Sequence, residues 1–201
     1  STINLLEGIR KFSKDTILIF SSTNKVYGDL EKFNYSEKNT RFTIKNNFKG
    51  FSENNILDFK SPYACSKGSA DQYVLDYARV FNLNTIVFRH SSVYGGRQFF
   101  TYDQGWIGWC CAQASKHKLI KKAKFSITGN GKQVRDLVHI EDITRLYKLS
   151  YKNFKKLKGK AYNIGGGINN SLSVIELLDF LEKKLNIKLN YYKIQNRLYD
   201  Q

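Results

Sequence analysis

The sequence SPYACSKGSADQYVLDYARVFNLNTIVFRH, residues 61–90, predicts a helix followed by a buried strand. Ser61 is a good N-cap and Pro62 suits the first helical turn, so we expect the helix to begin here. Apolar and aromatic residues then recur at helical spacing up to Phe81, where the pattern breaks. The short β-branched run 85–89 follows, and such a run is typical of a buried parallel strand.

A second strand pattern lies upstream, where the apolar run 16–20 changes abruptly into three hydroxyl residues at 21–23. A buried strand that opens into a site loop shows this change. Strand, helix and strand in this order form a parallel crossover unit, which is almost always right-handed. Because open parallel sheets bind ligands beyond the carboxyl ends of their strands, we expect a site at the polar segments 21–23 and 90–96.

Tyr63 and Lys67 lie four residues apart, which places both side chains on one face of the predicted helix. A phenol has a pKa of about 10 and is a weak base at neutral pH, but a nearby ammonium favours the phenolate and lowers that pKa. Together with Ser21, Ser22 and Thr23, these side chains could form one catalytic site. A Tyr-x-x-x-Lys pair also occurs by chance on exposed helices, so the pair alone is a weak motif.

Four motifs occur in order along the chain. They are Ile-Phe-Ser-Ser-Thr-x-x-Val-Tyr-Gly at 19–28, Ser-Pro-Tyr-x-x-x-Lys at 61–67, Arg-x-x-x-Val-Tyr-Gly-x-Arg-Gln at 89–98 and Val-Arg-Asp-x-x-His-x-x-Asp at 134–142. Together they resemble the extended short-chain dehydrogenase/reductase family of nucleotide-sugar epimerases and dehydratases, over essentially the whole chain. The stretch 88–109 is similar, more narrowly, to a subgroup that epimerises a CDP-linked sugar at C2.

The resemblance implies an α/β fold, with a partial Rossmann-like, doubly wound parallel sheet and a smaller substrate-binding region. Residues 1–95 would form the C-terminal part of the NAD-binding domain and carry the catalytic residues. Residues 96–201 would mainly bind the nucleotide sugar, with some elements returning to the Rossmann sheet. Because no Gly-x-Gly-x-x-Gly or Gly-x-x-Gly-x-x-Gly turn occurs, we expect an internal fragment that lacks the family's glycine-rich N-terminal half.

The resemblance also implies the catalytic roles. Tyr63, as phenolate, would remove a proton from a sugar hydroxyl while the carbon-bound hydrogen leaves to NAD, and Lys67 would assist Tyr63 and bond the nicotinamide ribose. Thr23 takes the position of the family's catalytic Ser/Thr, with Ser22 as the alternative. The ketone would then turn in the site and recover hydrogen on its other face, without net redox change. The residues expected to contact NAD are Phe20, Ser21, Ser22, Tyr63, Lys67 and His90.

The substrate implied by the resemblance is a nucleotide-diphosphate sugar, and a CDP-sugar is expected. Arg135 matches the family arginine that binds the diphosphate, and Arg197 with Asp200 matches an Arg-x-x-Asp that holds diphosphate and ribose. A guanidinium suits phosphate oxygens better than an ammonium does. A salt bridge with Asp136 or Asp142 is the structural alternative for Arg135. The other substrate candidates are Thr23, Ser92, Gln104 and Trp106, of which the last two could equally pack the smaller region.

Other elements are predicted further along the chain. A strand is expected at 124–127, a hairpin turn at 129–132 and another parallel strand at 161–164. Ser-Val-Ile-Glu at 173–176 is a capping box, and it opens an amphipathic helix through Leu185.

Composition and charge argue against several other classes of protein. The 201 residues include 33 Lys and Arg against 17 Asp and Glu, a formal net charge of +16 that could attract phosphate groups in general. The lysines are spread over many predicted turns without an aromatic platform, so a solvated surface is expected rather than a nucleic-acid site. The three cysteines and three histidines support neither a disulfide framework nor a metal site.

No run of about 18 apolar residues and no signal-peptide pattern occurs, so we expect a cytoplasmic protein without membrane contacts. The full-length protein is expected to form a homo-oligomer. Three alternatives remain open. They are a 4-epimerase or dehydratase with the same fold and NAD, a non-catalytic truncated remnant, and a nucleic-acid-binding module. The absence of an acidic pair beside Thr23 argues against a dehydratase.

Overall fold

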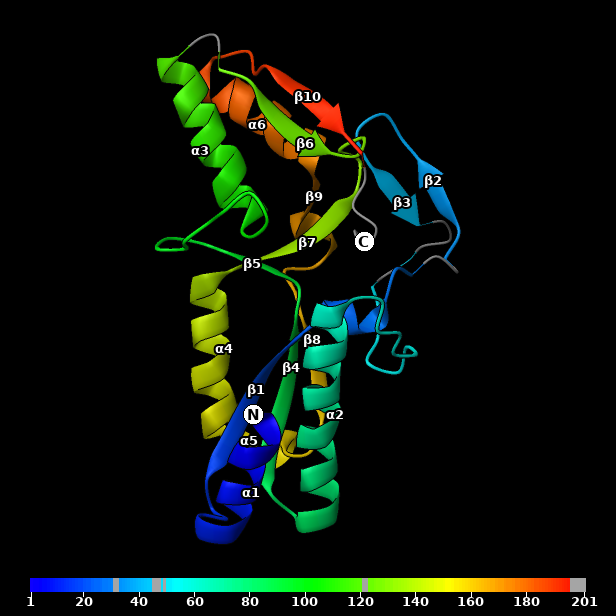
Figure 1. The fold of residues 1–201 in the computed structure, drawn as a ribbon, viewed down its shortest axis with the longest axis vertical. Helices are drawn as coiled ribbons and strands as arrows, with labels where there is room; N and C mark the ends of the chain where they lie inside the picture. The colour runs from blue at the N-terminus through cyan, green and yellow to red at the C-terminus, as the bar shows by residue number, and fades with distance from the viewer. Residues whose placement is uncertain (31–32, 45–47, 49, 121–122, 196–201) are drawn as a thin grey trace. The chain divides into compact units, whose positions relative to one another are not determined.

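The computed structural model describes residues 1–30, 33–44, 48, 50–120 and 123–195 (Figure 1). Contacts between residues divide the chain into two compact units. Unit 1 comprises Ser1–Leu30, Phe51–Ser91 and Glu141–Gly165, and unit 2 comprises Glu31–Gly50, Ser92–Ile140 and Gly166–Gln201. The chain thus passes twice from unit 1 to unit 2 before Glu141, the second time between Ser91 and Ser92, and returns to unit 1 at Glu141.

Unit 1 contains a three-stranded parallel sheet with the strand order β1–β4–β8. β1 and β4 pair in register from Ile17 opposite Asn84 to Thr23 opposite His90, so their carboxyl ends lie side by side. The predicted strand–helix–strand crossover is confirmed, because α2 connects these two parallel strands. The elements are β1 (Ile17–Thr23), α2 (Pro62–Phe81), β4 (Asn84–His90) and β8 (Ala161–Ile164).

The hydroxyl residues 21–23 belong to β1 itself, and the expectation that they form a loop is wrong. Each of them pairs with a residue of β4, which extends to His90. Pairing with β4 holds the polar end of the strand in place, although the apolar run ends at Phe20. A single 3-10 turn, η1 (Asn24–Tyr27), follows directly.

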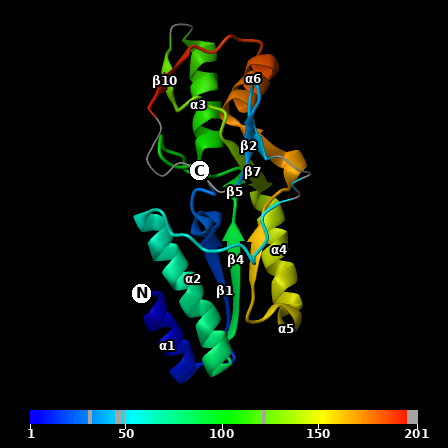
Figure 2. The same cartoon turned by 90° about the vertical axis from the view of Figure 1, so that its right-hand side faces the viewer.

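Helices cover both faces of the sheet of unit 1, as expected for a doubly wound fold (Figure 2). Alternate strand residues pack against opposite layers, because successive side chains of a strand point to opposite faces. Val87 of β4 packs with α1 and α2, whereas its neighbours Ile86 and Phe88 pack with α4 and α5. The covering helices are α1 (Thr2–Phe12) and α2 on one face, and α4 (Ile140–Lys152) and α5 (Phe154–Leu157) on the other.

The ends of α2 agree with the sequence signals. Ser61 is the N-cap, and its side-chain oxygen accepts a hydrogen bond of 3.1 Å from the backbone N–H of Ala64. Pro62 occupies the first helical position. At the other end, Asn82 adopts the left-handed conformation with φ of 56°, which an asparagine tolerates better than most residues do. Local chemistry therefore defines the helix that carries Tyr63 and Lys67.

Unit 2 contains a core between α3, α6 and β6. Its buried residues include Cys110 and Ala114 of α3, Ile127 of β6, and Leu178 of α6. The strands form three small sheets, β2–β3, β5–β7–β9 and β10–β6. The elements are β2 (Tyr35–Glu37), β3 (Phe42–Ile44), β5 (Ser92–Tyr94), α3 (Trp106–Leu119), β6 (Phe125–Thr128), β7 (Val134–His139), η2 (Ile168–Asn170), β9 (Ser171–Ser173), α6 (Val174–Leu185) and β10 (Tyr191–Ile194).

The hairpin turn predicted at 129–132 is wrong, because β6 and β7 belong to different sheets. β6 pairs in parallel with the distant β10, and β7 pairs with β5 and β9. Gly129 and Gly131 have positive φ angles of 64° and 76°, so the glycines do provide a change of direction, but one that leads into another sheet. The parallel strand predicted at 161–164 is confirmed as β8.

The predicted capping box of α6 is confirmed. The hydroxyl of Ser173 accepts from the backbone N–H of Glu176 at 3.1 Å, and the carboxylate of Glu176 accepts from the backbone N–H of Ser173 at 2.9 Å. The helix then ends at Leu185, as expected. Among the helices in the described part of the chain, none has both the length and the apolar character that crossing a bilayer requires.

Candidate active site

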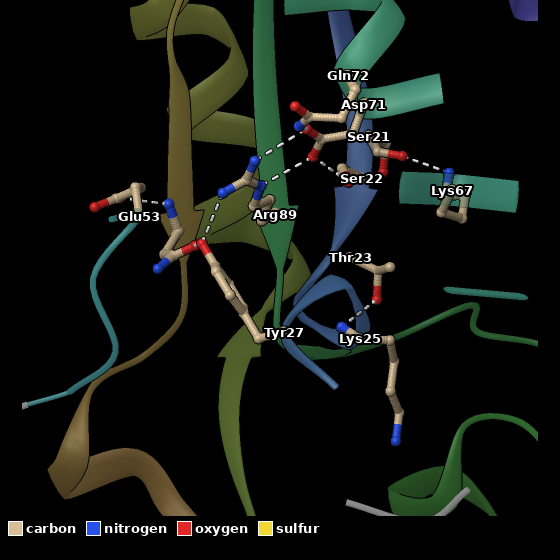
Figure 3. A network of polar contacts seen from close by, with 11 residues as sticks. Ser21, Ser22, Thr23, Lys25, Tyr27, Glu53, Lys67, Asp71, Gln72 and Arg89 are labelled. Carbon is tan, nitrogen blue, oxygen red and sulfur yellow. Dashed lines mark hydrogen bonds and ion pairs between the residues drawn. The ribbon is translucent and has the colours of Figure 1, made fainter. Parts of the chain in front are cut away.

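The two hydrophobic layers of unit 1 continue as polar side chains at the carboxyl ends of β1 and β4 (Figure 3). On β1, Phe20 packs in the layer of α1 and α2, and Ile19 packs in the layer of α4 and α5. Strand alternation therefore directs Ser22 toward α2 and Ser21 toward α4. The same rule applies on β4. Arg89 lies two residues after Val87 and points toward α2, and His90 lies two residues after Phe88 and points toward α4. Each helix layer thus ends in its own polar cluster.

The cluster on the α2 side is centred on Asp71, whose side chain is fully buried. Ser22 Oγ donates to Asp71 Oδ2 at 2.7 Å, and Arg89 donates to both carboxylate oxygens at 2.9 and 3.0 Å. Arg89 also donates to the phenol oxygen of Tyr27 at 2.9 Å. Burial alone would disfavour the charged guanidinium, but its hydrogen bonds to Asp71 and Tyr27 raise the pKa of Arg89 above its ordinary value.

The cluster on the α4 side contains His90 and Tyr147. His90 Nε2 lies 3.0 Å from the phenol oxygen of Tyr147, and the two rings are stacked at 10°. Burial lowers the pKa of His90, and the positive charge of Lys67 lowers it further. Burial raises the pKa of Tyr147, against the effect of a side-chain hydrogen bond with Ser21. The imidazole is therefore neutral at physiological pH.

Tyr63 and Lys67 lie on successive turns of α2, and Lys67 contacts the end of β1. Tyr63 is 56% exposed as a residue, so it lies at the surface rather than in the core. The ammonium of Lys67 donates a hydrogen bond to the backbone oxygen of Ser21 and lies 4.9 Å from the centre of the Phe20 ring. The structure thus brings Lys67 into direct contact with two of the residues predicted to bind a cofactor.

Thr23 differs from its neighbour Ser22 in what its hydroxyl does. Ser22 is 3% exposed, and its hydroxyl is bound to Asp71. Thr23 ends β1, and its Oγ1 accepts from the backbone N–H of Lys25 at 3.2 Å and donates only a long bond to the side-chain oxygen of Asn24 (Figure 3). A contact of Thr23 Oγ1 with Asn24 at 3.5 Å is at the limit of a hydrogen bond.

Among the described residues, four of the predicted substrate residues lie in unit 2. Ser92 of β5 pairs opposite Leu137 of β7, so Arg135, two residues before Leu137, shares its face of the small sheet. Arg135 donates to the backbone oxygen of Val134 at 3.3 Å, and the two carboxylates considered as its alternative partners each have further bonds. Asp136 accepts from the backbone N–H groups of two glycines, and Asp142 pairs with a neighbouring arginine at 2.6 Å.

Gln104 and Trp106 lie at the start of α3. The backbone of Gln104 is bonded to that of Thr101, and Trp106 packs against the core of unit 2, which agrees with the packing alternative. The indole N–H of Trp106 is nevertheless buried without a hydrogen-bond partner among the described residues. Arg197 and Asp200 lie outside the described residues.

A cavity of about 400 Å³ lies in unit 2, between the segment after β5 and one face of α3. Its polar lining comes from Tyr94, Arg97, Gln98 and Ser115, with Phe100 among the apolar residues. None of the described substrate candidates lines it. Tyr94, Arg97 and Gln98 belong to the motif at 89–98, but the sequence interpretation assigned none of them a role in binding.

The sequence interpretation also gave no role to Asp71, Arg89, Tyr27 or Tyr147. Two signals for them were present. Asp71 follows Lys67 by four residues and so lies on the same helical face. Arg89 occupies a position in phase with buried Val87, and a charge at such a position needs a partner because an isolated buried ion is costly. Tyr27 belongs to the motif at 19–28, but the motif gave its phenol no partner, and Tyr147 carried no comparable signal.

Comparisons with known proteins show the family of the chain. The model of the NAD dependent epimerase/dehydratase family matches residues 1–165. The chain therefore belongs to the NAD dependent epimerase/dehydratase family.

Individual relatives make the likeness more specific. The chain is 54% identical over 200 residues to the CDP-paratose 2-epimerase of Salmonella typhi, which covers all of the chain and 59% of that relative. It is 30% identical over 189 residues to a putative UDP-glucose 4-epimerase of Methanocaldococcus jannaschii, covering 93% of the chain and 52% of that protein. The chain thus spans between about half and three fifths of the length of these relatives.

Solved structures show the same fold. The structure of dTDP-glucose 4,6-dehydratase from Bacillus anthracis in complex with NAD superposes with a TM-score of 0.77, at 29% identity, covering 98% of this chain and 55% of that one. UDP-glucuronic acid 4-epimerase from Bacillus cereus, in complex with UDP-glucuronic acid and NAD, gives a TM-score of 0.75 at 25% identity and covers 97% and 53%.

Proposed function

We propose that this chain supplies catalytic and substrate-binding residues of an NAD-dependent nucleotide-sugar epimerase. The full-length protein would convert CDP-paratose to CDP-tyvelose by inverting C2. The observation that carries the proposal is 54% identity to CDP-paratose 2-epimerase across the whole chain, combined with the contact between Lys67 and the end of β1. The motifs of the sequence alone had led to the same class of reaction.

NAD fits the carboxyl ends of β1 and β4. Two buried polar atoms, His90 Nδ1 and Ser91 Oγ, lack a hydrogen-bond partner among the described residues, and polar groups of a bound ligand would satisfy them. Lys67 adds a positive charge beside them. NAD, when bound, supplies an acceptor and later a donor for the carbon-bound hydrogen of the sugar. The residues that would hold it are Phe20, Ser21, Ser22, Tyr63, Lys67 and His90, with Ser22 acting through its backbone because its hydroxyl is bound to Asp71.

The proton chemistry would belong to Tyr63. Its exposed phenolate would take the proton of the C2 hydroxyl, while the hydrogen on C2 leaves with its electron pair and C2 becomes a carbonyl. Lys67 would stabilise the negative charge of the phenolate. After the keto sugar turns over, hydrogen returns to the opposite face of C2 and Tyr63 returns the proton to the oxygen. Atoms and electrons balance, and the stereochemistry is inverted.

Thr23 would orient the hydroxyl that loses its proton. Its own hydroxyl lies at the end of β1 and donates only a 3.5 Å bond to Asn24, whereas the hydroxyl of Ser22 donates to buried Asp71 at 2.7 Å. This difference favours Thr23 over Ser22 as the residue that shares the proton with Tyr63. Thr23 would thus act in both catalysis and substrate binding.

The nucleotide sugar would be bound through further side chains. Arg135 offers a guanidinium suited to the diphosphate, and Ser92 shares its face of the β5–β7–β9 sheet. Arg197, Asp200, Gln104 and Trp106 remain proposed contacts. A CDP-sugar is the proposed substrate because of the identity to the Salmonella relative. A homo-oligomeric, cytoplasmic protein is proposed from the family resemblance.

The proposal is tested with the full-length protein, NAD and CDP-paratose. Nuclear magnetic resonance of the sugar product is expected to show the C2 epimer. Tyr63→Phe is expected to lower kcat by at least about a hundredfold, with binding of the nucleotide sugar retained in calorimetry. Tyr73→Phe is the matched control, since Tyr73 is a partly exposed tyrosine on the same helix.

Other reaction products would support the alternative functions. Inversion at C4 of a UDP-sugar, or loss of water from a dTDP-sugar, would favour the other reactions found among the relatives. Full turnover by Tyr63→Phe would reject the assignment of the proton transfer. Absence of all three reactions in the full-length protein would favour a non-catalytic remnant.

A further inference from the structure

The carboxylate of Asp71 is saturated with hydrogen bonds inside unit 1. Oδ2 accepts from Ser22 Oγ and from Arg89 Nε, and Oδ1 accepts from Arg89 Nη2 and from the side chain of Gln72 at 2.9 Å. An ionised carboxylate offers about four acceptor positions, so none remains for a substrate or a water molecule. The side chain is also completely shielded from solvent. Asp71 therefore cannot act on a substrate directly.

The same network joins five elements of unit 1. Asp71 lies on α2, Ser22 on β1 and Arg89 on β4, and the guanidinium of Arg89 reaches Tyr27 in η1 (Figure 3). The phenol of Tyr27 in turn donates to the side chain of Asn163 on β8 at 2.6 Å. All three strands of the sheet are thus connected to α2 through directional bonds at the ends that would face the substrate.

We propose that Asp71 is a positioning residue, which together with Arg89 fixes where α2 lies against the end of β1. The inference rests on the proposed function, because α2 carries Tyr63 and Lys67. Asp71 lies one helical turn after Lys67 and two turns after Tyr63, on the same face. Its partner Ser22 directly precedes Thr23. If α2 slid along its axis, Tyr63 and Lys67 would therefore move away from Thr23. The same movement would break the hydrogen bonds of Asp71.

Apolar packing between α2 and the sheet would not fix this register alone. Val74 of α2 packs beside Leu18 and Phe20 of β1, but hydrophobic contacts are not directional and tolerate sliding. Buried ion pairs add little net stability compared with apolar residues of similar volume, although removing one partner is costly. A fully bonded polar network instead specifies one geometry. Its value here would lie in the placement of the active-site groups.

The test separates placement from stability. In the full-length protein, Asp71→Leu combined with Arg89→Met replaces the buried pair by apolar residues of similar size. We expect an unfolding temperature close to that of the wild type, a fall in kcat of about ten- to a hundredfold, and a change in KM of less than about twofold. The control replaces Asp76 and Arg79 by alanine, an exposed ion pair on the same helix, and is expected to leave both kinetic constants unchanged.

Ser22→Ala provides a second variant, which removes only the hydroxyl bond to Asp71. It is expected to lower kcat several-fold without unfolding the protein, so the idea stays testable if the double variant does not fold. Wild-type kcat in a folded double variant, or in Ser22→Ala, would overturn the proposal.

A measurement that needs no catalytic turnover distinguishes the positioning role of Asp71 from the proposed function. The threonine methyl groups of the full-length protein are isotopically labelled and observed by nuclear magnetic resonance without substrate. The resonance of Thr23 is identified because it disappears in Thr23→Ser. Its resonance is expected to shift in the double variant and in Ser22→Ala, and to stay in place in the Asp76, Arg79 control. An unmoved resonance would overturn the positioning role even if the enzyme is active. A shifted resonance in a protein without epimerase activity would support the role while the proposed reaction fails.

Discussion

His90 Nε2 lies 3.0 Å from the phenol oxygen of Tyr147, and the two rings stack almost in parallel inside unit 1. The pair continues the layer of Phe88, whose ring contacts both of them edge-on. A histidine in this environment is held neutral by burial and by the nearby charge of Lys67. The arrangement makes the stability of the sheet depend on pH.

We expect the wild-type protein to lose stability as the pH falls below about 6.5. The folded-state pKa of His90 lies below its ordinary value of 6.5, because burial and the charge of Lys67 oppose protonation. The unfolded chain then binds the proton more readily than the folded chain does. The contribution of neutral His90 to the free energy of unfolding is therefore complete above pH 6.5 and is lost at lower pH. Urea unfolding at pH 7.5, 6.5 and 5.5 measures the effect, and His90→Gln is expected to reduce the slope.

Tyr147→Phe is the control for that measurement. It removes the hydrogen-bond partner but keeps both the apolar surroundings and Lys67, so most of the pH dependence should remain. The same slope in wild type and His90→Gln would contradict the prediction.

Thr23→Val tests the proposed division of roles between the two neighbouring hydroxyls. Valine keeps the shape of threonine but has no hydroxyl, so kcat of the full-length protein is expected to fall by about a hundredfold. Thr23→Ser retains the hydroxyl and should keep most of the activity. Loss of the bond to the N–H of Lys25 is expected to lower the free energy of unfolding by only about 1 kcal/mol. Thermal unfolding checks that both variants are folded, and undiminished turnover in Thr23→Val would speak against its role.

The three cysteines are expected to differ in their reactivity. Cys65 is exposed on α2, whereas Cys110 is buried and Cys111 is half-buried in α3. Burial raises the pKa of Cys110 to about 12 and also raises the pKa of Cys111, so neither forms much thiolate at pH 8. A chromogenic disulfide reagent should therefore release one equivalent quickly from the native chain, and three after unfolding. Cys65→Ser should abolish the fast phase, and a second fast equivalent in the wild type would contradict the burial of α3.

Ser173→Ala should destabilise unit 2. The hydroxyl of Ser173 is completely buried, accepts from Glu176 N–H and donates to the backbone oxygen of Thr40 at 2.6 Å. Its removal is expected to lower the free energy of unfolding by about 1–2 kcal/mol. Fluorescence during urea unfolding reports on this unit, because both tryptophans of the chain lie in α3.

Ser1→Ala is the matched control for the cap of α6. Ser1 is also an N-cap, but its bond to the N–H of Asn4 is exposed and 3.4 Å long. The control should therefore have a smaller effect on unfolding. An equal loss in both variants, or none in Ser173→Ala, would contradict the assigned importance of the cap.

Several elements could be predicted from short stretches of sequence. The start of α2 at Pro62, its end before Asn82 and the capping box of Ser173 depend on chemistry within a few residues. Such signals are local, because capping and helix spacing involve neighbours along the chain. The parallel strands and the crossover followed from the order of apolar runs, and the family followed from four spaced motifs.

Other features depend on contacts between distant residues. The turn at Gly129 looked like a hairpin, but β6 pairs with β10 more than sixty residues later along the chain. The cluster of Asp71 joins Ser22 to a residue 49 positions away. No short window of sequence contains both partners of such a contact.

The sequence by itself determined the helices that start after Ser61 and Ser173 and the apolar strand cores at 16–20, 85–89 and 161–164, because each of these needs only residues that are close along the chain. The proposed chemistry of Tyr63 and Lys67 came from the order of four motifs. Only the tertiary structure decided that β1 continues through its hydroxyl residues, that Ser22 is bound to Asp71 while Thr23 is not, and that Lys67 contacts Ser21. The physical reason is that strand pairing and buried polar bonds depend on which distant groups meet after folding, and on the alternation that turns each side chain to one face of the sheet.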